Sequence, residues 1–276
     1  MQTDDWVRAE DYAEPRCLLC DEPHGAKPKP KHIPWQRVRE KFDAYTSAND
    51  YAGARRHMLY WLDEARLGGD LLGEFQIHNE LMGLYRKTAQ EKEAFQSMDA
   101  ALTLVRSLRL DARIDGATAL LNAATVCSAF GQNEKALSLF TQAKEIYDKQ
   151  LAPDDPRMGG LCNNMGLSLV ALGRYDEADA LYRRALEVMA HAPHGALEQA
   201  ITYLNMADAA FLRSGEDKQA DEYLETALGL LEDERLARDG YYAFVCEKCA
   251  PTFLGFGWDA YGKELQERAR EIYERN

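Results

Sequence analysis

The chain has 276 residues, of which 46% are hydrophobic, so it is long and apolar enough to bury a large core and is not a disordered protein. Its 33 basic and 46 acidic residues give a formal net charge of -13, which disfavours binding to nucleic acid or to anionic lipid. No apolar run reaches the roughly 18–20 residues that are needed to cross a bilayer, so no membrane association is expected.

The first residues of the chain, MQTDDWVRAEDY, indicate the compartment. They are acidic where a signal peptide would carry a basic segment followed by an apolar one. Six cysteines in the whole chain are too few for a disulfide-rich secreted scaffold. The sequence therefore predicts a cytoplasmic protein with free thiols.

Residues 1–34 are predicted to form an extended arm, because they contain five prolines among polar residues. The arm also holds side chains of the types that bind zinc. They are Cys17, Cys20, His24 and His32. The spacing of these residues is not that of a standard zinc finger, so two interpretations stay open. Either the arm carries a local metal site, or it packs over the first helix pair and buries the cysteines together with Leu18 and Leu19.

The rest of the chain, residues 35–276, carries a repeat of 42 residues in which small side chains recur in three series. The first series is Ala89, Gly131, Gly173, Gly215 and Gly257. The second is Ala94, Ala136, Ala178, Ala220 and Gly262. The third is Ala101, Ala143, Ala185, Ala227 and Ala269. Small residues at a turn and along a helix let two helices approach closely, so the three series predict stacked helical hairpins.

Six helix–turn–helix units are expected from this repeat. Their predicted bounds are 35–66, 72–108, 114–152, 156–191, 197–233 and 238–275. The first unit is degenerate and turns at Asn49-Asp50, and the fifth carries one extra residue in its turn at Gly215. Because no alternating β-branched run occurs anywhere, the chain is predicted to be all-α.

The clearest unit, residues 163–189, resembles the tetratricopeptide repeat. The resemblance is carried by Gly166, Gly173, Tyr175, Ala178, Tyr182 and Ala185. Usual repeats of this family have about 34 residues, and the longer period here is similar to that of kinesin light chain. The resemblance extends over roughly residues 35–275. It implies a right-handed superhelical α-solenoid of about six units, with a concave face built from the first helix of each unit.

Four further cysteines fall on first helices, at positions that face the partner helix. They are Cys127, Cys162, Cys246 and Cys249. A buried free cysteine behaves as a small apolar residue, so these thiols are predicted to be core. A zinc site that joined Cys246 and Cys249 to the arm would require the arm to reach the far end of the solenoid, so the core interpretation is favoured.

One position of the first helix, two residues before Gly166, is expected to face the hollow of the superhelix. Its occupants in successive units are Glu80, Asn122, Asn164, Asn205 and Lys248. A carboxamide both donates and accepts hydrogen bonds, so asparagines here can pair with the backbone of an extended peptide. The resemblance to kinesin light chain and to chaperone-binding repeats implies this role. The other interpretation, that the asparagines bond only to a neighbouring first helix or to water, stays open.

The two ends of this row carry opposite charges, Glu80 at one end and Lys248 at the other. We expect a bound peptide to present a basic residue near the first and an acidic one near the second. The lysine and arginine pattern that chaperone-binding repeats use to hold a C-terminal carboxylate is missing around the asparagines. Binding of such a tail is therefore not expected.

No phosphate-binding loop, dinucleotide-binding glycine motif, metalloprotease motif or nucleophile-elbow motif occurs, so neither an enzyme nor a cofactor is expected. The first hypothesis is a scaffold that binds a peptide or protein segment in its concave groove. The second is a homodimer that forms through the aromatic-rich last unit, with its groove empty or filled by the arm. The third is a zinc- or thiol-dependent adaptor that uses Cys17 and Cys20. The sequence does not identify the partner.

Overall fold

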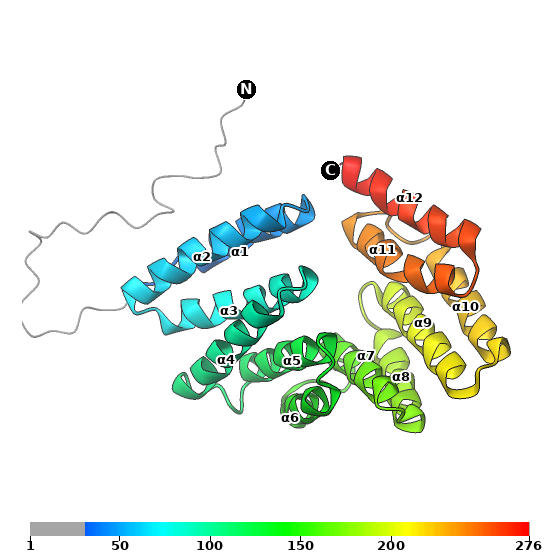
Figure 1. The fold of residues 1–276 in the computed structure, drawn as a ribbon, viewed down its shortest axis with the longest axis horizontal. Coiled ribbons are helices and arrows are strands. Elements are labelled where there is room, and N and C mark those ends of the chain that lie inside the picture. Colours follow the sequence, from blue (N-terminus) through cyan, green and yellow to red (C-terminus); the bar gives the residue numbers. More distant parts are fainter. Residues whose placement is uncertain (1–30, 276) are drawn as a thin grey trace, which may run out of the picture. The chain divides into compact units, whose positions relative to one another are not determined.

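A computed structural model of the chain describes residues 31–275, and these form α-helices without a strand (Figure 1). The helices are α1 (Trp35–Ser47), α2 (Tyr51–Gly68), α3 (Leu71–Lys87), α4 (Glu91–Ser107), α5 (Ile114–Ala129), α6 (Asn133–Gln150), α7 (Pro156–Ala171), α8 (Tyr175–Met189), α9 (Gly195–Ser214), α10 (Asp217–Leu231), α11 (Gly240–Gly255) and α12 (Asp259–Arg275). The prediction of an all-α repeat protein is confirmed. Cys17, Cys20 and His24 lie outside the described residues, so a metal site on the arm stays a prediction.

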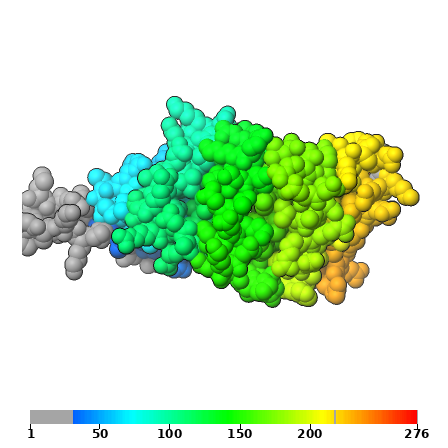
Figure 2. Space-filling view, turned by 90° about the horizontal axis from the view of Figure 1, so that it is seen from below, coloured from blue at the N-terminus to red at the C-terminus, as the bar shows by residue number. Residues whose placement is uncertain are grey.

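The chain divides into two compact units, which we call unit 1 (residues 1–111) and unit 2 (residues 112–276). In both units each odd-numbered helix packs against the even-numbered helix that follows it. In unit 2 the successive pairs are joined by buried clusters, so the hydrophobic core runs from one pair to the next. Figure 2 shows these pairs as adjacent bands of colour, from green to yellow. That the two units form one continuous solenoid stays a prediction.

The turns within the hairpins lie at the predicted positions, where the backbone has a positive φ angle. Glycine occupies four of these turns, with φ of 77° at Gly131, 71° at Gly173 and Gly215, and 80° at Gly257. The left-handed conformation costs a residue with a Cβ atom about 1–2 kcal/mol, which explains the series of glycines. Ala89, with φ of 53°, is the exception in the series.

The alanine series lies along the contact between the two helices of each pair. Ala101, Ala143 and Ala185 are completely buried, and so are Ala94 and Ala136. Gly166 shows why the residue must be small, because a Cβ atom at this position would lie 2.4 Å from the ring of Tyr182. The small residues therefore set the distance between the helices, and the large side chains fill the space between pairs.

The four cysteines of the first helices are buried, as predicted, and none is in a disulfide. Burial raises the pKa of the Cys162 and Cys246 thiols to about 11 and that of Cys249 to about 12. Thiols in this state are poor nucleophiles and poor metal ligands. They serve here as small apolar core residues.

The last residues of the arm, 31–33, pack at the junction between α2 and α3. The carboxylate of Asp70 caps α3 by accepting from the N–H of Gly73, and it also accepts from the N–H of Ile33 at 2.9 Å. Nδ1 of His32 lies 3.0 Å from the same carboxylate, and the backbone N–H of Lys31 donates to the carbonyl of Gly68. Asp70 is therefore the side chain that fixes the entry of the chain into its first helix.

Candidate functional site

The inner face of unit 2 is formed by the first helix of each pair. Figure 1 shows α5, α7, α9 and α11 along the inner side of this unit, with their partner helices outside. These four helices carry Asn122, Asn164, Asn205 and Lys248, which are half-buried or exposed. We call this surface the inner face. It is where the sequence predicts that a peptide binds.

Two asparagines of the inner face, Asn164 and Asn205, have different environments. The side chain of Asn205 donates from Nδ2 to Oδ1 of Asn163 at 2.9 Å, and Asn163 donates in turn to the hydroxyl of Thr202 at 3.1 Å. Asn205 is thus bonded to a neighbouring first helix, as the second interpretation had it. Asn164 is half-buried, and its carboxamide forms no hydrogen bond within the described residues. The carboxamide of Asn164 thus differs from that of Asn205 in having no partner within the described residues.

The charged ends of the predicted row belong to different units, Lys248 to unit 2 and Glu80 to unit 1. Lys248 is exposed on α11, and it forms no ion pair with the rest of the described chain. Glu80 belongs to α3 in unit 1, where its carboxylate lies 3.9 Å from Arg39. Burial raises the pKa of the Glu80 carboxyl, and Arg39 opposes that shift. The expected polarity of the groove stays a prediction.

A pocket of about 670 Å³ opens on the inner face, and we call it the inner-face pocket. It is lined by Leu167 and Val170 of α7, Asp208, Phe211 and Leu212 of α9, and Pro251, Thr252, Gly255 and Phe256 at the end of α11. Three of its apolar side chains are unusually accessible, since Leu212 is 59% exposed, Leu167 41% and Phe211 40%. Exposed apolar side chains that converge on a hollow are typical of binding surfaces.

The pocket and the asparagine row form one surface, because the same helix faces carry both. Leu167 follows Asn164 by three residues, and Leu212 follows Asn205 by seven, which places each pair on one side of its helix. On α11, Thr252 follows Lys248 by one turn. A segment that lies across α7, α9 and α11 would therefore meet polar groups and then an apolar hollow.

Asp208 is the ionisable residue of the inner-face pocket. Its carboxylate is half-buried and accepts a hydrogen bond from Thr252, but no basic side chain of the described chain pairs with it. Burial raises the pKa of Asp208, and the hydrogen bond from Thr252 offsets only part of that shift. A carboxylate held among apolar walls without a counter-ion is a specific electrostatic feature of this site.

Sequence reasoning missed the inner-face pocket, although one signal was present. Leu167 stands one turn after Asn164, where a clamp for a carboxylate would place a basic residue, and an apolar side chain there indicates a different kind of contact. The residues on α9 were harder to assign, because the extra residue in the turn at Gly215 shifts the helix faces of the fifth unit.

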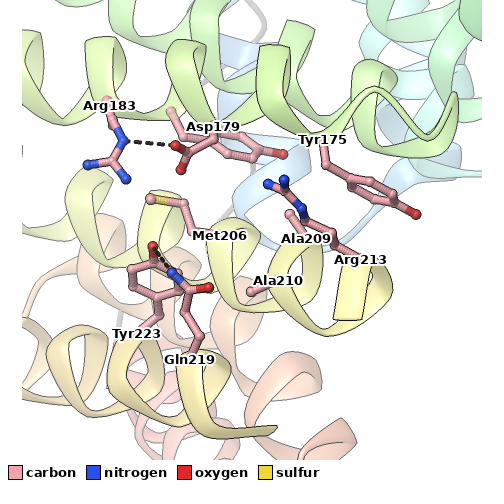
Figure 3. Close-up of a pocket in the computed structure, with 10 residues that line it drawn as sticks. Tyr175, Asp179, Arg183, Met206, Ala209, Ala210, Arg213, Gln219 and Tyr223 are labelled. Carbon is pink, nitrogen blue, oxygen red and sulfur yellow. Dashed lines mark hydrogen bonds and ion pairs between the residues drawn. The ribbon is translucent and has the colours of Figure 1, made fainter. Parts of the chain in front are cut away.

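A second hollow of about 220 Å³ lies between α8, α9 and α10 (Figure 3). Its two arginines are already paired, Arg183 with Asp179 and Arg213 with Asp176, each at 2.8 Å. The hydroxyl of Tyr182, another lining residue, is buried without a hydrogen-bond partner in the described chain. Because both arginines already have carboxylate partners, the larger inner-face pocket is the better candidate.

The aromatic residues of the last unit mostly belong to the core. Tyr242 and Phe253 are completely buried, and Tyr241, Phe256 and Trp258 pack against the same cluster. Phe244, which is 42% exposed, stacks against Tyr241. The interpretation that these aromatic side chains pack on the preceding unit fits this arrangement. The dimer contact stays a prediction, and Phe244 is the exposed aromatic side chain of the last unit that would form it.

Two further features bear on the expected function. Within residues 31–275, no group of three or more histidine, cysteine, aspartate or glutamate side chains is placed to hold a metal ion. His32, the candidate ligand of the arm that is described, has a side chain 70% exposed that is engaged with Asp70. No helix in the same part of the chain is long and apolar enough to span a membrane.

Comparison with known proteins agrees with the repeat. The tetratricopeptide repeat family model matches residues 74–149 and 161–233, which is more than half of the chain. A protein from Arabidopsis thaliana named kinesin light chain-related 3 is 26% identical over 136 residues, which span 42% of this chain and 20% of the plant protein. The compared segment thus spans about a fifth of that relative's length.

Solved structures show the same fold. Two crystal structures of a putative kinesin light chain from Podosopora anserina, which has nearly identical TPR-like repeats, align with TM-scores of 0.52 and 0.51 at 18% identity. Each alignment covers 73% of this chain and about all of the other, 95% and 96%. Proteins built from such repeats are generally scaffolds without catalytic activity that bind proteins or peptides. The chain belongs to the tetratricopeptide repeat family, with long repeats similar to those of kinesin light chain.

Proposed function

We propose that the protein is an adaptor whose unit 2 binds an extended segment of a partner protein along its inner face. The observation that carries this proposal is the inner-face pocket, where Leu167, Phe211 and Leu212 are exposed beside the unpaired carboxamide of Asn164. Apolar side chains of a ligand would fill the pocket, and Asn164 would hydrogen-bond its backbone. Asn122 and Lys248 extend the contact at the two ends.

The asparagines have different roles in this proposal. Asn205 and Asn163 join α7 to α9, and this pair keeps the two helices in place under the ligand. Asn164, one residue along α7, is turned by about 100° around the helix axis and is left to bind. Asn163→Ala should therefore lower the stability of unit 2, whereas Asn164→Ala should lower affinity alone.

A displayed library of random peptides, selected on the immobilised full chain, tests the proposal. The selected peptides are then measured by fluorescence anisotropy. We expect Leu212→Glu to weaken binding more than tenfold, because it places a charge against apolar ligand atoms. Asn164→Ala should weaken binding about fivefold, through the loss of one hydrogen bond. Leu72→Glu is the matched control, because Leu72 is a similarly exposed leucine of unit 1. Equal affinities of the two glutamate variants would overturn the proposal.

The alternative function, self-association through the last unit, makes a different prediction. Light scattering would report a dimer, and Phe244→Ser would return it to a monomer. A monomer at all concentrations would rule out self-association.

A further inference from the structure

The inner-face pocket is mostly apolar, and its one ionisable side chain is an aspartate. Its walls are the side chains of Leu167, Val170, Phe211, Leu212, Pro251 and Phe256. The carboxylate of Asp208 lies among them. Phe211 and Phe256 meet edge to face, with ring centroids 5.5 Å apart, and so present one continuous aromatic corner next to this carboxylate.

Nothing else in the described chain neutralises this charge. Thr252 gives the carboxylate one hydrogen bond, and no lysine or arginine acts on it. Lys248 lies one turn before Thr252 on α11, and it forms no ion pair with Asp208. A carboxylate that is partly removed from water without a cation is costly, so a ligand that supplies the cation recovers that cost on binding.

We propose that the inner-face pocket takes the side chain of an arginine or lysine from an extended partner segment, with its cationic end at the carboxylate of Asp208. This inference rests on the proposed function and names the chemistry of the ligand. The aliphatic part of the side chain lies against Leu212 and Leu167. Arginine is the better fit, because a guanidinium stacks on aromatic rings such as those of Phe211 and Phe256.

The overall charge of the protein supports a basic ligand. A formal net charge of -13 attracts cationic segments and raises their rate of encounter with the surface. The exposed ammonium of Lys248 beside the pocket disfavours a run of several basic residues. We therefore expect one basic residue with apolar neighbours.

The test uses the peptides selected on the full chain. Sequencing should show arginine or lysine enriched at one position, with apolar residues next to it. The best peptide is then resynthesised with citrulline in place of arginine, which keeps the shape and removes the charge. We expect citrulline to weaken binding to the native chain at least about tenfold, and to change binding to the Asp208→Asn variant less than about twofold. Asparagine retains an acceptor for Thr252, and circular dichroism checks that the variant is folded.

The matched control is Asp179→Asn, which changes an aspartate of the α8–α10 hollow and should leave the effect of citrulline intact. Selected peptides without an enriched basic residue would overturn the inference and leave the proposed function standing. So would a citrulline effect of the same size in the native chain and in Asp208→Asn. If no peptide is enriched on the native chain, the proposed function and the inference fall together.

Discussion

His78 offers the sharpest test of how burial controls the stability of this protein. It lies on α3 with a side chain only 6% exposed, and neither ring nitrogen has a hydrogen-bond partner in the described chain. Burial, and to a smaller extent the nearby Arg66, lowers the pKa of His78 from 6.5 to about 4. An unpaired polar group in a core costs about 1–3 kcal/mol. We therefore expect His78→Leu, which keeps the size and removes both nitrogens, to be more stable at pH 8 by about 1 kcal/mol or more.

The advantage of His78→Leu should grow in acid. Because the folded pKa lies below the unfolded one, only the unfolded chain binds a proton at this ring between pH 6.5 and 4. The native chain then loses about 2 kcal/mol relative to the variant at pH 5, and about 3 kcal/mol below pH 4. Urea unfolding of both proteins at pH 8 and pH 5, followed by circular dichroism, measures this difference.

A second histidine provides the control. Nε2 of His57 donates to the carbonyl of Val38 at 2.9 Å, so His57→Leu should lower stability at pH 8 by about 1 kcal/mol. The reasoning is refuted if the stability gap between the native chain and His78→Leu is the same at both pH values, or if His78→Leu is the less stable protein. A direct titration of the His78 ring by NMR should find it uncharged down to about pH 4.

Three further changes probe the fold. Asp70→Ala should cost about 2–3 kcal/mol, because it removes the cap of α3 and leaves the N–H of Ile33 unpaired, and hydrogen exchange at Ile33 should accelerate. Gly166→Ala should lower the stability by about 1–3 kcal/mol, because the added methyl group clashes with Tyr182. Gly83→Ala should stabilise α3 by up to about 1 kcal/mol, because the added methyl group there meets nothing within 4 Å. Thermal unfolding measures both changes. Ellman's reagent followed by mass spectrometry should find the four buried thiols unmodified until the protein is unfolded, and rapid native labelling of Cys162 would contradict its place in the core.

Sequence was a good guide to the fold because the fold depends on local rules that repeat. A glycine at the hairpin turn allows the positive φ angle that the turn needs, and an alanine allows the two helices of a hairpin to pack closely. Both requirements return every 42 residues, as at Gly131 and Gly173 and at Ala143 and Ala185. The burial of the cysteines follows from the same register. None of these features needs knowledge of how one hairpin lies against the next.

The site was less predictable because it does depend on that arrangement. Asn163 and Asn164 are neighbours in sequence, and which of them is buried is decided by Thr202 and Asn205 on the next first helix. The inner-face pocket likewise exists only where the ends of α7, α9 and α11 converge. The periodic pattern predicts that the asparagines face inward. It does not distinguish Asn205, which bonds to a neighbouring helix, from Asn164, which has no partner in the described chain.

On α9, Asn205 bonds to the neighbouring helix, whereas Asp208 is proposed to bind a ligand. The effect of Asp208 on stability can therefore be tested without a ligand. Burial disfavours the charged form of the Asp208 carboxyl in the folded chain, and one hydrogen bond from Thr252 offsets part of this effect. Asp208→Asn removes the charge and keeps an acceptor for that hydrogen bond. The variant should therefore be at least as stable as the native chain at pH 7, and any gain should shrink as the pH falls and the native carboxyl takes up a proton. Thermal unfolding at pH 7 and pH 4.5 gives the answer. A variant that is markedly less stable at pH 7 would mean that the carboxylate is needed by the fold itself, and the argument that it awaits a cationic ligand would lose its basis.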